Sequence, residues 1–222
     1  MKNIAIDGPA GAGKSTLARA LASALGFRYV DTGAIYRSIA YHFQMCGIGP
    51  RDKDNIHRFL GDANVQVTYT DAGEQRMILN GTDITDELRT PELSAFASTV
   101  SANAEVRRYL LEMQRRIARK NDCVMDGRDI GTVVLPHADL KLFVTASPET
   151  RAQRRLLELE AKGEQISYAR VLADINARDE ADSTRTIAPL KQAADALLLD
   201  TTELDIPQAL NAALELARER GI

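Results

Sequence analysis

A glycine-rich segment close to the N-terminus constrains the fold of this chain more than any other stretch. Residues 4–7 are Ile-Ala-Ile-Asp, a short apolar run typical of a buried strand. Leu17, Leu21 and Leu25 then fall on one face of a helix. Between the two lies Gly-Pro-Ala-Gly-Ala-Gly-Lys-Ser at residues 8–15. A strand, a glycine-rich turn and a helix in this order predict the first unit of an α/β fold.

That segment also fits the pattern of a phosphate-binding loop, Gly, four residues, Gly-Lys, then Ser or Thr. Glycines let backbone N–H groups close around an anion, and the start of the helix adds unpaired N–H donors. The alternative is a chance lysine in a glycine-rich turn, but the flanking strand and helix favour a nucleotide site. The predicted loop comprises Gly8, Pro9, Ala10, Gly11, Ala12, Gly13, Lys14, Ser15 and Thr16, with the Lys14 cation for the transferring phosphoryl group and the Ser15 hydroxyl for Mg²⁺.

Composition limits the class of protein. A length of 222 residues suits one α/β domain with an insertion, and a formal net charge of -3 gives no electrostatic case for nucleic acid or an anionic membrane as a partner. No apolar run reaches the roughly 18 residues of a membrane span, and the first residues do not resemble a secretory signal. Cys46 and Cys123 lie among apolar neighbours without metal-ligand spacing, which predicts buried free thiols. We expect a cytoplasmic protein, and a monomer because no long apolar stripe is left over.

Five apolar runs alternate with helical patterns along the chain. This alternation predicts a parallel, doubly wound sheet that binds its ligands at the carboxyl ends of the strands. Polar residues follow three of the runs, at Asp7, at Asp31-Thr32 and at Asp126 to Asp129, so one site is expected to span several loops. The predicted strands are residues 3–7, 27–31, 122–125, 140–145 and 196–199.

Residues 61–85 differ from this plan, because hydrophobic and polar residues alternate there. Residues 65–69 and 77–79 alternate as half-buried strands do, and Asn80-Gly81 is a strong hairpin signal. A small antiparallel insertion is therefore predicted. Helices are expected at residues 33–47, and at 90–119 with a break near 101–103.

Arginines cluster in the second half of the chain. Arg151, Arg154 and Arg155 share one helical face, and Arg178 shares another with Asp182 and Arg185. A solvated face with salt bridges is the ordinary explanation of such runs. Few carboxylates stand at the matching spacing, however, so we expect poorly neutralised arginines that contact phosphate.

Further features narrow the class of phosphate-loop protein. The chain has no Asn-Lys-x-Asp guanine-reading motif, which argues against a GTPase, and residues 122–126 are only a weak version of the strand found in motor ATPases. Arginines spread over several loops suit a second phosphorylated substrate, because cations offset the repulsion between two phosphates.

At this point the chain resembles the bacterial cytidylate kinases over essentially its full length. The resemblance rests on residues 6–15, on Asp-Thr-Gly-Ala-Ile-Tyr-Arg at 31–37, on Asp-Gly-Arg-Asp-Ile-Gly-Thr-Val-Val at 126–134, and on residues 151–155 and 178–185. It implies a P-loop NTPase three-layer fold with a central five-stranded parallel sheet and a small antiparallel β insertion in the monophosphate-binding region. The implied single kinase unit, 1–222, has a core of about 1–60 and 104–222, a lid of about 147–185 and an insertion of about 61–103.

The resemblance also implies a reaction in pyrimidine nucleotide metabolism. The γ-phosphoryl group of ATP, with Mg²⁺, would pass to CMP or dCMP and give ADP and CDP or dCDP. Catalytic residues would be Lys14, Arg128 and Arg185, and Arg154 would join the phosphate loop in binding ATP. The monophosphate substrate would meet Thr32, Tyr36 and Arg37 along its length, Ser98, Arg107 and Asp129 at the cytosine, Arg128 and Arg185 at its phosphate, and Arg178 and Asp182 at its sugar.

Two positions depart from the family pattern. Thr32 stands where serine is common, and Ala181 stands where the family often has another arginine, which puts the contribution of the lid there in doubt. Two alternatives stay open: a P-loop kinase of another small molecule, such as UMP or shikimate, and a nucleotide-binding module without turnover. A panel of monophosphates in a kinase assay distinguishes them.

Overall fold

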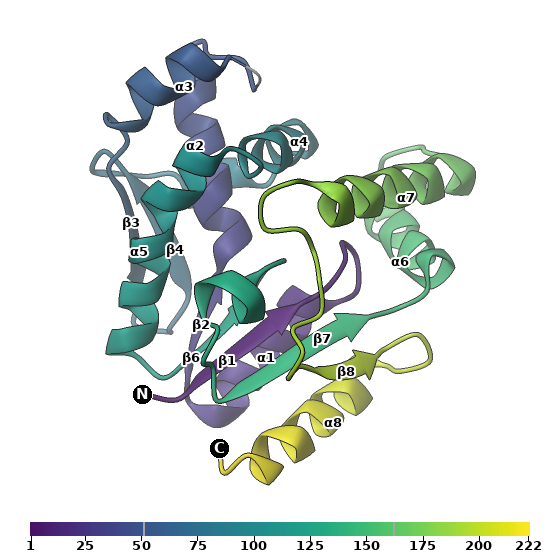
Figure 1. Cartoon of the computed structure of the whole chain (residues 1–222). Coiled ribbons are helices and arrows are strands. Elements are labelled where there is room, and N and C mark those ends of the chain that lie inside the picture. The colour runs from purple at the N-terminus through teal and green to yellow at the C-terminus, as the bar shows by residue number, and fades with distance from the viewer. Residues whose placement is uncertain (51, 162) are drawn as a thin grey trace.

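The computed structural model describes residues 1–50, 52–161 and 163–222, and a five-stranded parallel sheet forms its centre (Figure 1). The order is β2-β6-β1-β7-β8, so the strand that precedes the glycine-rich loop lies in the middle. The prediction of a parallel sheet is confirmed, and each predicted strand boundary lies within one residue of the observed one. The strands are β1 (Asn3–Asp7), β2 (Arg28–Asp31), β6 (Cys123–Asp126), β7 (Leu140–Thr145) and β8 (Leu197–Asp200).

Helices cover both faces of this sheet because successive strand side chains point to opposite sides. Ile4 and Ile6 pack with α1 (Lys14–Leu25) and α8 (Ile206–Glu219). Ala5 lies in the other core, with α2 (Thr32–Met45) and α5 (Ala104–Lys120). Two layers of helices therefore enclose the apolar strands and leave their carboxyl ends for the site. No helix among the described residues has both the length and the hydrophobicity needed to cross a bilayer.

A second, antiparallel sheet confirms the predicted insertion. It consists of β3 (Val65–Tyr69), β4 (Gln75–Leu79) and β5 (Thr82–Asp83), and Asn80 and Gly81 turn the chain with φ of 50° and 85°. The helix α3 (Lys53–Leu60) precedes it, and the short helix η1 (Thr85–Leu88) and α4 (Pro91–Val100) follow. Val65, Met77 and Leu79 join the same hydrophobic core as α2, so this sheet is packed onto the main unit.

The segment from 147 to 185 forms two helices that lie beyond the carboxyl end of β7 (Figure 1). They are α6 (Pro148–Glu160) and α7 (Tyr168–Thr184), and each begins with a serine that caps its helix, Ser147 or Ser167. Ala152, Leu159, Val171 and Ile175 form a small core of their own between the two helices. The two helices therefore share few apolar side chains with the sheet.

The two cysteines differ from each other. Both are free, and Cys123 is buried in β6 as predicted, but Cys46 is exposed. The prediction of a buried Cys46 is wrong because α2 ends at Met45, which leaves Cys46 at the end of the helix instead of on its packed face.

Candidate active site

The glycine-rich loop connects the central strand β1 to α1 at the carboxyl edge of the sheet. Gly8 has φ 147°, and a Cβ atom at this position would overlap the carbonyl oxygen of Val144 in β7. Only glycine fits such a close approach. Gly13 stands before α1 with φ 78°. The loop is therefore held against the sheet at one end and opens the helix at the other.

Lys14 folds back onto the loop, and Ser15 contacts the end of β6. The Lys14 ammonium is buried and donates to the carbonyl oxygen of Pro9 at 2.6 Å. Burial lowers the pKa of Lys14 below its usual value, and the nearby Arg128 adds to this effect. The Ser15 hydroxyl donates to Asp126 Oδ2 at 2.7 Å. A cation, a hydroxyl and a carboxylate thus lie around the start of α1.

Asp126 is a further candidate site residue, whose individual role could not be predicted from the sequence. Its Oδ1 accepts from the Tyr29 hydroxyl at 3.0 Å, and burial raises the pKa of this carboxyl. Ser15 and Asp126 supply two hard oxygens, which fits Mg²⁺, an ion that proteins bind through one or two carboxylates and substrate phosphates. Within the described ranges no group of three His, Cys, Asp or Glu residues can hold a metal ion. Ser15 and Asp126 are the candidate ligands.

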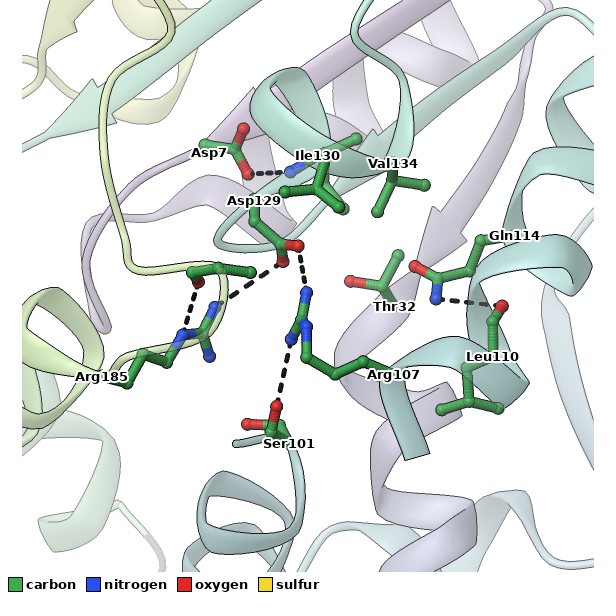
Figure 2. A network of polar contacts seen from close by, with 12 residues as sticks. Asp7, Thr32, Ser101, Arg107, Leu110, Gln114, Asp129, Ile130, Val134 and Arg185 are labelled. Atoms are coloured by element: carbon green, nitrogen blue, oxygen red, sulfur yellow. Dashed lines mark hydrogen bonds and ion pairs between the residues drawn. The ribbon is translucent and has the colours of Figure 1, made fainter. Parts of the chain in front are cut away.

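A second carboxylate, Asp129, is the centre of a buried network (Figure 2). It follows β6 and precedes a π-helical turn, η2 (Ile130–Val134). Arg107 from α5 donates to Asp129 Oδ2, and Arg185 lies 3.7 Å from Oδ1. Arg107 also donates to the carbonyl oxygen of Ser101 at 3.1 Å. The fold therefore brings together three of the predicted site residues, although they come from different elements.

Asp7, at the end of β1, fixes the turn that carries Asp129. Its two carboxylate oxygens accept from the backbone N–H groups of Ile130 at 2.8 Å and Gly131 at 2.7 Å. Burial nevertheless raises the pKa of Asp7 to about 6. The ionised form is thus disfavoured in the folded protein even though it receives two hydrogen bonds.

This shift predicts a pH dependence that Asp7→Asn removes. Because the folded-state pKa lies above the unfolded value, protons stabilise the fold, and this contribution is lost as the pH rises through 6. The free energy of unfolding of the wild type should fall, relative to that of Asp7→Asn, by about 2 kcal/mol between pH 4.5 and 7. Urea unfolding of both proteins across this range measures the difference. If the free energies of unfolding of the two proteins change in parallel over this range, the pKa of the Asp7 carboxyl is not raised in the folded protein.

The arginines of α6 are better neutralised than the sequence suggested. Arg151 is buried, donates to the carbonyl oxygen of Ala10 in the loop at 3.1 Å and pairs with Asp179 at 2.6 Å. Arg155 pairs with Glu158 at 3.0 Å. Arg154 donates to the carbonyl oxygen of Thr201 at 2.7 Å. The expectation of poorly neutralised arginines is wrong for Arg151 and Arg155, because Asp179 of α7 and Glu158 of α6 pair with them. It holds for Arg154, whose partners among the described residues are neutral oxygens.

Other predicted substrate residues are held by polar contacts at the ends of β2 and β6. The Thr32 hydroxyl donates to the carbonyl oxygen of Asp126 at 2.7 Å. Arg37 donates to Asp31 at 3.0 Å. Arg128 donates to Asp182 of α7 at 2.8 Å. Asp31 is thus a second carboxylate at the site to which the sequence analysis assigned no role.

The remaining predicted residues lie on helices around this network. The Arg107 guanidinium lies over the Tyr36 ring, 5.6 Å from its centroid, so the N-terminal part of α2 borders the Asp129 network. Ser98 is half-buried on α4, and Arg178 is exposed on α7. No ion pair of Arg178 is found among the residues that the structure describes.

Comparisons with known proteins agree with this geometry. The family model described as Cytidylate kinase matches residues 4–219. A cytidylate kinase of Caldicellulosiruptor bescii is 48% identical over 96% of this chain and 94% of its own length. One of Carboxydothermus hydrogenoformans is 49% identical over 96% of each chain.

The fold is also found among solved structures. An uncharacterized protein from Eubacterium ventriosum has a TM-score of 0.56 over 97% of both chains, at 12% identity, and thus shares the fold alone. The family itself is established by the match over residues 4–219 and by relatives that are nearly half identical. The chain belongs to the cytidylate kinase family.

Proposed function

We propose that this protein transfers the γ-phosphoryl group of ATP to CMP or dCMP and releases ADP and CDP or dCDP. The observation that carries the proposal is the family match, which spans residues 4–219 and so includes both the phosphate loop and the Asp129 network. Kinases of UMP or shikimate, and a module without turnover, are not favoured, because the similar relatives described above are cytidylate kinases.

On the donor side, the loop from Gly8 to Thr16 binds the phosphates of ATP. Its N–H groups and the start of α1 offer donors to the phosphate oxygens. The hydrogen bond between Ser15 and Asp126 supports a role for both in holding Mg²⁺. When bound, Mg²⁺ neutralises charge on the phosphates. Arg154, on the first helix of the lid, is the further ATP contact.

On the acceptor side, the monophosphate lies between α2, α5 and α7. Tyr36 and Arg37 face it from α2, together with Thr32, and Arg178 and Asp182 face its sugar from α7. Ser98, Arg107 and Asp129 bind the cytosine. The contacts of Arg107 with both Asp129 and Tyr36 support this arrangement, because they hold three polar side chains next to one another.

Catalysis in this proposal is charge compensation. Two phosphate groups of like charge have to approach each other, and Lys14, Arg128 and Arg185 stabilise the charge that develops on the transferring group. The lid, about 147–185, closes so that water does not accept the phosphoryl group instead. Arg151 supports the coupling of the lid to the loop, because it contacts Ala10 and Asp179 at once.

The division into a core of about 1–60 and 104–222 and an insertion of about 61–103 is part of the proposal, as are the monomeric state and the cytoplasmic location. The separate small core between α6 and α7 supports a lid that moves as a unit. The insertion instead shares its core with α2, so it is expected to move together with the acceptor-binding residues of that helix.

A coupled assay of ADP formation tests the proposed activity. With ATP and Mg²⁺, the protein should turn over rapidly with CMP and dCMP and slowly with UMP, and it should not turn over with shikimate. Rapid turnover with UMP or shikimate, or no turnover with any acceptor, would contradict the proposal. A Lys14→Ala preparation serves as the control for contaminating kinases.

A further inference from the structure

Gln114, in the middle of α5, carries a buried polar atom that the site described so far does not use. Its side chain is only 1% exposed. The amide nitrogen donates to the carbonyl oxygen of Leu110 at 3.2 Å (Figure 2). The amide oxygen, Oε1, has no hydrogen-bond partner among the described residues. Figure 2 shows this oxygen pointing away from Leu110, toward the side of Thr32.

The contact with Leu110 determines which amide atom is free. In the reverse orientation two oxygens would face each other across this contact, so the nitrogen belongs there and Oε1 is the unpaired group. A buried acceptor without a partner costs about 1–3 kcal/mol. Such an atom in a folded protein needs an explanation, and a ligand that supplies the missing donor is one.

Gln114 lines a cavity of about 270 Å³ beside the Asp129 network. Tyr36 and Arg107 line the same cavity, and most other walls are apolar, from Leu111, Val133, Val134 and Ile187. Burial raises the pKa of Tyr36, so its phenol stays protonated and remains a donor. The cavity thus presents donors from Tyr36 and Arg107 and one unused acceptor from Gln114, which suits a ring that carries an amino group.

We propose that Gln114 Oε1 accepts a hydrogen bond from the exocyclic amino group of cytosine and is a specificity-determining residue of this kinase. The inference rests on the proposed function, which puts cytosine next to Arg107 and Asp129. An exocyclic amino group has two N–H donors, so Asp129 accepts from one and Gln114 from the other. Uracil has a carbonyl oxygen in that position, which repels both acceptors and leaves them unpaired.

Gln114→Met tests the role of the acceptor, because methionine has a similar shape and no amide oxygen. We expect kcat/KM for CMP to fall about tenfold, and the CMP-to-UMP ratio to fall with it. The midpoint of thermal unfolding should decrease only slightly, because Oε1 makes no internal hydrogen bond among the described residues and the variant loses only the long contact of the amide nitrogen with Leu110. Gln114→Glu, which keeps an acceptor at this position, should retain more of the CMP preference than Gln114→Met.

Tyr36→Phe is the matched control, since Tyr36 lines the same cavity. An unchanged CMP-to-UMP ratio in Gln114→Met would overturn the inference. So would equal losses with CMP and UMP that Tyr36→Phe reproduces, because Gln114 would then only position the tyrosine. Wild-type protein that does not phosphorylate CMP would contradict the proposed function itself, so the two failures are distinguishable.

Discussion

Lys14→Ala is expected to lower kcat for phosphoryl transfer by about 10²-fold or more and to leave the fold intact. The Lys14 side chain extends from the first residue of α1 back over the loop, where it reaches the carbonyl oxygen of Pro9 at 2.6 Å. It is therefore positioned inside the predicted phosphate cradle. Its desolvation lowers its pKa, which means that an anion beside it would stabilise the charged form strongly. Alanine removes this charge at the transferring group.

The experiment compares kcat and thermal unfolding of the wild type, Lys14→Ala and Lys2→Ala. Lys2 lies before the opposite end of β1, is half-exposed and pairs with Asp139 at 3.4 Å, so its removal should leave kcat nearly unchanged. Stability should change little in Lys14→Ala, because the variant also removes a buried charge. Near-normal turnover by Lys14→Ala would show that Lys14 does not act on the transferring phosphoryl group.

The sheet could be predicted from the sequence because its strands are buried on both faces. Such strands are continuous apolar runs, as in Leu140–Thr145, and the helices between them require parallel pairing. The antiparallel insertion could also be predicted, from the alternation of hydrophobic and polar residues and from the turn signal Asn80-Gly81. The exposure of Cys46 could not be predicted, because it depends on the residue at which α2 ends, and periodicity determines helix ends poorly.

The loop could be predicted for a different reason: its motif lies within one continuous stretch of the sequence. The carboxylates of the site come from distant segments instead. Asp179 reaches Arg151 from the second helix of the lid, and Asp182 reaches Arg128 across 54 residues of chain. A count of charges within one stretch does not detect such pairs, which is why the partner of Arg151 could not be predicted from its helix alone. Asp126 was visible as a strand-end aspartate, but its role follows only from the contact with Ser15.

Asp129→Ala is expected to have the other large effect, on substrate choice. Cytosine presents an amino group where uracil presents a carbonyl oxygen, and a carboxylate accepts from the first and repels the second. Asp129 is engaged by Arg107 and Arg185, yet a carboxylate has about four acceptor sites and so keeps capacity for the base. We expect kcat/KM to fall about 10²-fold or more with CMP and much less with UMP.

The loss of Asp129 also leaves two arginines, each with a side chain 9% exposed, without their carboxylate. Breaking a buried pair typically costs about 3–5 kcal/mol, so stability has to be measured alongside activity. Asp182→Ala is the matched control, because Asp182 is a buried aspartate that pairs with Arg128 and is expected to face the sugar. It should reduce activity with CMP and UMP in the same proportion. If Asp129→Ala does the same and leaves the ratio between the substrates unchanged, Asp129 only positions the arginines and does not read the base.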